Sequence, residues 1–373
     1  MEDAIDSYFD LFRDIRDDPE YASSRSWDLE NINHDAQFSS DHSVRQYAIK
    51  LFGLIGAKVR PQEVGKYLLA IENTGDEAFE YELTMAHIRV STPPCSQRAI
   101  EIMRTSAWFK TWDKRFRFDV RNIFRAIAES KSELFLEFLH EKAEQEEYEG
   151  ALFNSYQEIL NAIKAIGSNK SEQTVLSIIE TCKDFNVSNQ LILTLGVVGG
   201  SESIAKLREV IFSHDMNSDN SIYFCWHPVA FASCSLGRLK DLESVDKMVE
   251  LWHNGYKSPL LARAFSLLNY EKAIPILIEG TGDRSIDIVV GSLRALGDIG
   301  GDEAKNHLLY LENKGITHHI KCLNPEMPSR DYELNVIPRA ALILALNEVG
   351  KYNGRRDHLE RAKRTVPLYL YEH

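Results

Sequence analysis

Apolar residues recur along this chain at three- and four-residue intervals, the spacing of a helix that buries one face. They form a repeated phrase in which an apolar run ends in Leu-Gly or a near relative, a short polar turn follows, and a second amphipathic stretch begins. The clearest copies run from Leu195 to Ile204 and from Leu296 to Ala304. Each copy predicts two helices joined by a turn, with apolar faces that one pair cannot bury alone.

The phrase returns through most of the chain. Its anchors, the residues that end each apolar run, are Gly53, Ala128, Gly167, Gly196, Gly237, Asn269, Gly297 and Asn347, with one further unit placed around 86–103. They predict an all-α chain of about nine stacked helix pairs. At Gly196 and Gly297 we expect the missing side chain to let the next helix pack closely. Ser201 and Asp302 are the expected N-caps of the helices that follow.

The phrase resembles the HEAT-repeat family in its short form, the type named after phycobilin lyases, whose consensus is similar to A-x-x-A-L-G-x-I-G-x-x-x-A-x-x-x-L. The best match is Arg294–Ala304, which reads RALGDIGGDEA. The resemblance is good over 155–310 and weaker over 43–150 and 311–350. It implies a right-handed α-solenoid with a concave inner surface. It implies no single activity, because such arrays serve many functions.

The pattern divides the chain into three parts: 1–42, 43–350 and 351–373. In the first part, residues 2–17 predict an amphipathic helix that Pro19 ends, and 22–43, rich in Ser, Asp and Asn, predict a loop. In the last part, 353–364 predict a basic helix before an extended tail. We therefore expect an acidic N-terminal cap, a HEAT-like solenoid and a basic C-terminal cap.

Charge is uneven along the chain. The net charge is -13, and residues 1–42 alone carry 12 acidic and 3 basic side chains. An acidic head on a nearly balanced body argues against coating nucleic acid and favours a basic protein partner at one end, although acidic residues also simply keep a protein soluble. No apolar run approaches the ~18 residues of a membrane span, and the start lacks the pattern of a secretory signal, so we expect a cytoplasmic protein.

The segment 104–125 combines seven basic residues and two acidic ones with six aromatic residues. Cations interleaved with aromatics suit phosphates and bases, and Trp and Arg also dominate protein interfaces. A third interpretation makes the aromatics core and lets the seven Glu of 133–149 neutralise the cations from a neighbouring helix. The candidate partner-binding residues are Trp108, Lys110, Trp112, Lys114, Arg115, Arg117 and Arg121.

No motif for catalysis or metal binding emerges. The five cysteines are irregularly spaced without a CxxC, and neither Cys225, His227 and Cys234 nor His318 with Cys322 match zinc spacing. Deoxyhypusine hydroxylase, a HEAT-like enzyme, holds iron through several His-Glu pairs, whereas this chain has only His140-Glu141. We therefore expect no disulfide framework, no metal and no cofactor.

Two functions of different classes remain. The first is a non-catalytic scaffold or adaptor, an assembly factor or an immunity-type protein, that binds a protein partner through the solenoid surface. The second is a nucleic-acid-binding protein similar to the HEAT-like alkylpurine DNA glycosylases, which use a basic, aromatic-lined groove and an Asp. Here 104–125 would be that groove, with Asp113 or Asp119 as the acid. We favour the scaffold, and its oligomeric state stays open.

Overall fold

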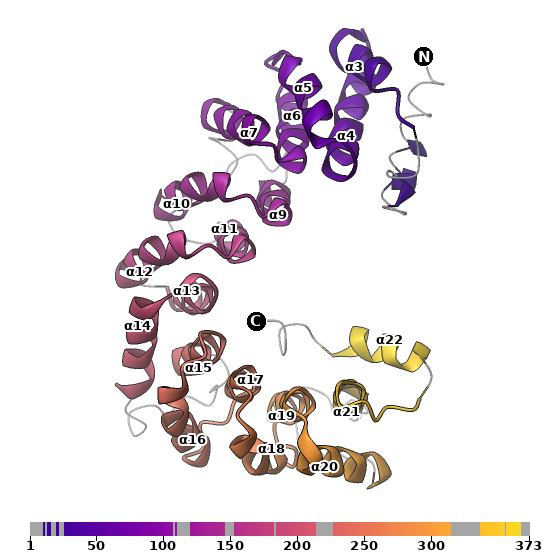
Figure 1. Ribbon diagram of the computed structural model, residues 1–373. Helices are drawn as coiled ribbons and strands as arrows, with labels where there is room; N and C mark the ends of the chain where they lie inside the picture. Colours follow the sequence, from indigo (N-terminus) through magenta and orange to yellow (C-terminus); the bar gives the residue numbers. More distant parts are fainter. Residues whose placement is uncertain are drawn as a thin grey trace, which may run out of the picture. The chain divides into compact units, whose positions relative to one another are not determined.

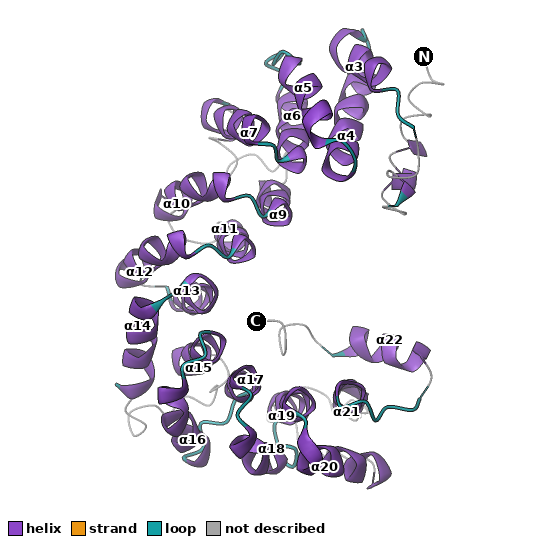
Figure 2. Cartoon of the chain, viewed as in Figure 1, coloured by secondary structure: helices purple, strands orange, loops and turns teal. Residues whose placement is uncertain are grey.

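The computed structural model describes residues 10–11, 13–15, 20–21, 26–106, 109, 120–145, 153–182, 184–213, 227–314, 336–354 and 356–366. Within these ranges the chain consists of helices joined by short loops, and no strand occurs (Figure 2). The prediction of an all-α chain is confirmed. No helix in these ranges is long and apolar enough to cross a membrane.

The chain forms two compact units, Met1–Thr174 and Val175–His373. The helices up to the boundary are α3 (Leu29–Phe38), α4 (His42–Lys58), α5 (Pro61–Ala70), α6 (Glu77–Val90), α7 (Pro93–Thr105), α9 (Val120–Ser130), α10 (Leu136–Gln145), α11 (Phe153–Ile166) and α12 (Glu172–Thr181), within which the boundary falls. Short 3₁₀ turns precede α10 (Glu133–Phe135) and α12 (Asn169–Ser171). In this first unit α4, α6, α9 and α11 pack one against the next in chain order, and the other helices cover them (Figure 1).

The second unit repeats this arrangement. Its helices are α13 (Phe185–Val198), α14 (Ser201–Phe212), α15 (Pro228–Arg238), α16 (Val245–His253), α17 (Pro259–Leu268), α18 (Ile274–Gly280), α19 (Ile286–Ile299), α20 (Gly301–Lys314), α21 (Val336–Glu348) and α22 (Arg356–Thr365). The odd-numbered helices from α13 to α21 pack in sequence order, and α22 packs on α21 (Figure 1). We call α4, α6, α9, α11 and these odd-numbered helices the first helices. Each is followed by a second helix, so the described chain holds nine pairs, as the repeats predict, in a solenoid-like stack within each unit.

Helix α17 shows how the local sequence sets these elements. The hydroxyl of Ser258 accepts a hydrogen bond from the backbone N–H of Leu261 at 3.0 Å, and Pro259 occupies the first turn, where its missing N–H is not needed. The helix ends at Asn269 with φ 52°. Asparagine adopts this left-handed conformation more readily than most residues. The repeat copy that ends in Leu-Asn instead of Leu-Gly therefore places its anchor at the helix cap.

Four of the glycine anchors, Gly53, Gly196, Gly237 and Gly297, lie at close contacts between successive first helices. A Cβ on Gly297 would lie 2.7 Å from the Cα of Ala345 in α21, and one on Gly196 would lie 2.7 Å from the Cα of Ser235 in α15. Real Cβ atoms do not approach a backbone this closely, so only glycine fits without a shift of the helices. The predicted close packing at Gly196 and Gly297 is confirmed.

Three sequence predictions are wrong. Residues 22–43 do not form a loop throughout, because α3 occupies Leu29–Phe38; its polar surface hides three buried residues on one face, Leu29, Ile32 and Ala36, and Asp28 caps its start. Ser201 does not cap α14 but is its first residue, preceded by Gly200, whose N-cap position carries no side-chain hydrogen bond. Asp302 likewise does not cap α20, because that helix begins at Gly301 and Asp302 lies in its first turn. Burial explains the difference at α3, and a shift of the helix start by one or two residues explains the two caps.

Candidate functional site

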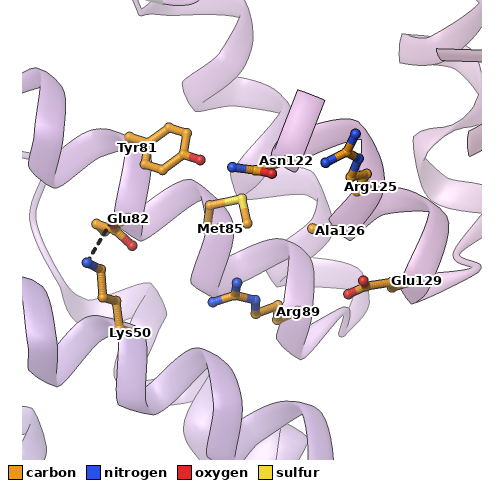
Figure 3. Close-up of a pocket in the computed structure, with 9 residues that line it drawn as sticks. All are labelled: Lys50, Tyr81, Glu82, Met85, Arg89, Asn122, Arg125, Ala126 and Glu129. Atoms are coloured by element: carbon orange, nitrogen blue, oxygen red, sulfur yellow. Dashed lines mark ion pairs between the residues drawn. The ribbon is translucent and has the colours of Figure 1, made fainter. Parts of the chain in front are cut away.

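A polar pocket of about 270 Å³ opens among three first helices of the first unit (Figure 3). We call it the α4–α6–α9 pocket. Its lining residues are Lys50 on α4, Tyr81, Glu82, Met85 and Arg89 on α6, and Asn122, Arg125, Ala126 and Glu129 on α9. Helical spacing explains the set: three- and four-residue steps bring the α6 residues to one face, and the same holds on α9. The pocket thus depends on the stacking of three successive pairs.

Lys50 and Glu82 form an ion pair across the first two helices, with the lysine nitrogen 3.2 Å from a carboxylate oxygen. Both side chains are largely buried. Burial raises the pKa of Glu82, while the charges of Lys50 and Arg89 act in the opposite direction. The ammonium of Lys50 also lies 5.1 Å from the ring centre of Tyr47, in a cation–π contact.

Arg125 is engaged in the same way with the next first helix. Its Nε and Nη2 both donate to one carboxylate oxygen of Glu158 on α11, at 2.9 and 2.6 Å. The arginine is about half exposed, and the glutamate is mostly buried. The ion pair fixes Arg125 at the rim of the pocket and links α9 to α11.

Arg89 differs from these two cations. Its stem lies over Gly53 of α4, where an added Cβ would be 3.6 Å from the arginine Cδ. The side chain is half-buried, and Figure 3 shows its guanidinium inside the pocket, between Lys50 and Glu129. Within the described ranges, the guanidinium of Arg89 makes no hydrogen bond and no ion pair within 4 Å. Its charge acts on Glu82, but no group in the described part of the chain accepts a hydrogen bond from it, so an acceptor from outside the chain can do so.

The structure places the sequence-predicted binding residues only in part. Trp108, Lys110, Trp112, Lys114, Arg115 and Arg117 lie outside the described residues. Arg121 is described and lies exposed on α9, directly before Asn122 of the pocket.

The described remainder of 104–125 is engaged within the fold. Arg104 forms an ion pair with Glu141 of α10 at 2.8 Å, which is the neutralisation by the acidic run that the sequence suggested as one interpretation. Phe109 and Phe124 are buried in the core, with ring centres 6.4 Å apart. Lys142 lies over the Phe109 ring at 5.7 Å.

Sequence reasoning missed Lys50, Glu82 and Arg89, although a signal for Lys50 was present. Lys50 lies three residues before the anchor Gly53, and Arg125 lies three residues before the anchor Ala128. A cation at a fixed distance before an anchor falls on the same face of each first helix. Recurrence relative to the anchors would therefore have indicated the pocket better than local charge density.

The chemistry of the site is recognition by charge and hydrogen bonding. No group of three or more potential metal ligands occurs among the residues that the structure covers. Cys95, Cys182 and Cys234 are free thiols, and burial raises the pKa of the Cys234 thiol, which keeps it protonated and unreactive. The pocket presents cations, carboxylates, an amide and a thioether, a set that suits a polar ligand with an apolar part.

No protein-family model matches this chain, and no curated protein is similar to it at a significant level.

Proposed function

We propose that this chain is a non-catalytic scaffold or adaptor that binds a partner protein across the first helices of its first unit. The observation that carries the proposal is the α4–α6–α9 pocket, which is assembled from three consecutive helix pairs. A surface that draws its contacts from several repeats suits an extended partner better than a compact substrate.

A protein partner is preferred to nucleic acid because of the charges around the pocket. Arg104 and Arg125, both in the basic segment, already pair with glutamates. Glu82 and Glu129 line the pocket and would repel a phosphate backbone. The acidic balance of the whole chain, with a net charge of -13, opposes a polyanion as well.

The proposal is tested by blocking the mouth of the pocket. Asn122 is exposed on α9 and lines the pocket, whereas Gln62 is exposed on the second helix α5 of the same unit. The full chain and the variants Asn122→Trp and Gln62→Trp are used to capture proteins from the native host, with quantification by mass spectrometry. A protein that the wild type and Gln62→Trp capture, and that Asn122→Trp captures at least tenfold less, supports the proposal.

Nucleic acid is measured in parallel by fluorescence anisotropy with single- and double-stranded oligonucleotides. We expect no binding tighter than about 10 µM at physiological salt, within the range of non-specific association. Sub-micromolar, salt-sensitive binding that Asn122→Trp abolishes would instead assign the surface to nucleic acid. Equal protein capture by both variants would remove the pocket from the interface.

A further inference from the structure

The α4–α6–α9 pocket contains one cation whose environment is incomplete. Lys50 has Glu82 at 3.2 Å and Arg125 has Glu158 at 2.6 Å. The half-buried guanidinium of Arg89 has no such partner in the described part of the chain. Removing a charged group from water is unfavourable unless hydrogen bonds replace the lost hydration. An acceptor from outside the chain that reaches Arg89 would therefore supply the hydrogen bonds that the guanidinium lost with its hydration.

We propose that Arg89 binds the carboxylate of an Asp or Glu side chain, in an acidic peptide segment of the partner protein. This inference rests on the proposed function and names the chemistry of the partner at the same pocket. The planar guanidinium matches a carboxylate through two parallel N–H···O bonds, and charge-assisted bonds of this kind are about twice as strong as neutral ones.

The surrounding charges favour a single carboxylate over a phosphate or a run of acids. Glu82 and Glu129 line the pocket, and Glu158 lies on Arg125 at its rim. Three cations, Lys50, Arg89 and Arg125, already face these three carboxylates. A group with two negative charges is therefore repelled more strongly than a single carboxylate placed directly on the guanidinium of Arg89.

The other lining residues define what accompanies the carboxylate. Met85 and Ala126 form an apolar part of the wall, and the thioether of Met85 adapts to varied shapes. Asn122 is exposed at the pocket, and its amide can donate and accept a hydrogen bond to a peptide backbone. Glu129 is exposed at the other end and disfavours a second acidic residue there. The segment therefore has an isolated Asp or Glu beside an apolar side chain.

The test uses a phage library of random twelve-residue peptides, selected on the full chain and on two variants. Arg89→Gln removes the charge in the pocket, and Arg60→Gln removes an exposed charge at the start of α5, where Arg60 pairs with Glu63. We expect the wild type and Arg60→Gln to enrich peptides with Asp or Glu at one fixed position beside an apolar residue. Arg89→Gln is expected to lose that position.

An enriched peptide is then synthesised, and its affinity is measured by fluorescence anisotropy. Replacing its acidic residue by the amide, or Arg89 by Gln, is expected to weaken binding at least tenfold each. Both changes together should cost little more than either alone, because they remove one interaction. If Arg89→Gln fails to fold, Asn122→Asp, which adds a carboxylate at the exposed edge of the pocket, is expected to weaken the acidic peptide similarly.

The outcomes separate this inference from the proposed function. Enriched peptides that Asn122→Trp no longer binds, but that carry no conserved Asp or Glu, would overturn the inference and leave the scaffold proposal standing. Failure of the wild type to enrich any peptide would count against both. Binding of inorganic phosphate that depends on Arg89, without acidic peptides, would replace the carboxylate by a phosphate ligand.

Discussion

The Cα atom of Ala345 lies 2.7 Å from the position that a Cβ on Gly297 would occupy. The same relationship joins Gly237 to Ala264 at 2.9 Å and, in the first unit, Gly53 to Ala86 at 2.9 Å. Each glycine belongs to one first helix and each small residue to the next. These contacts set the spacing of the stacked pairs, and in the first unit that spacing positions the walls of the pocket.

Gly297→Ala is expected to destabilise the second unit by about 1–3 kcal/mol, because the new methyl group collides with the backbone of α21. The sign of the change in the free energy of unfolding is informative. Helix propensity alone would make Gly→Ala stabilising by about 1 kcal/mol, so a loss of stability must come from the contact with α21. The free energy of unfolding is measured by urea titration. Gly282→Ala is the matched control, because the nearest atom to its added Cβ is the carbonyl oxygen of Glu279 at 3.6 Å. A stabilised Gly297→Ala variant would mean that the glycine is incidental.

Stability is expected to fall in mild acid because of His87. This side chain is fully buried in α6, and neither ring nitrogen has a hydrogen-bond partner within the described residues. Burial, with a contribution from the charge of Arg98, lowers its pKa to about 3. The unfolded chain has the ordinary value near 6.5, so it binds the proton more readily and gains stability relative to the fold as pH falls. The free energy of unfolding is therefore undiminished by His87 above about pH 6.5, and it decreases progressively as the pH falls toward about 3.

The measurement compares wild type with His87→Leu in urea titrations at pH 7 and pH 5. Each pH unit in this window corresponds to about 1.4 kcal/mol, so the wild type should lose about 2 kcal/mol more than the variant between the two conditions. His87→Leu removes two unpaired polar atoms and should be at least as stable as the wild type at pH 7. Equal pH dependence of the two proteins would show that His87 is hydrated in the fold.

The ion pair between Arg208 and Asp241 is expected to stabilise the second unit. Arg208 Nε donates to an Asp241 oxygen at 2.9 Å, and the Ser244 hydroxyl donates to the same carboxylate, which is almost fully buried. Burial opposes ionisation, but the hydrogen bonds from Arg208 and Ser244 outweigh it and lower the pKa of Asp241. Asp241→Ala should cost about 1–3 kcal/mol, because it removes bonds to a charged acceptor.

Glu243 supplies the control for this variant. It pairs with the same arginine at 2.7 Å but is largely exposed, so Glu243→Ala should cost no more than about 1 kcal/mol. Thermal or urea unfolding of the two variants distinguishes the cases. Similar losses for both would indicate that burial of the carboxylate adds nothing.

The fold was largely predictable because its signal is local and repeated. Helix pairs follow from apolar spacing within a dozen residues, and the close approach at Gly297 follows from a glycine in an apolar run. Helix α3 was missed because its polar residues masked the spacing of Leu29, Ile32 and Ala36. Three buried positions in ten residues outweigh the composition of a loop once a neighbouring helix covers them.

The candidate site was predictable only at its edge. Arg125 lies in the segment that composition singled out, but Lys50, Glu82 and Arg89 lie far from it in the chain. Only the stacking of α4, α6 and α9 brings these residues together. A search for local charge density cannot find a site whose members are contributed one or a few at a time by successive repeats.

Photo-crosslinking tests the partner-binding surface most directly, with p-benzoylphenylalanine placed at position 122 of the full chain in its native host and position 62 as the control. We expect irradiation to link one protein to position 122 and none to position 62, and we expect Arg89→Gln to reduce the link from position 122. No protein product from position 122, or equal products from both positions, would contradict a partner-binding surface at the α4–α6–α9 pocket.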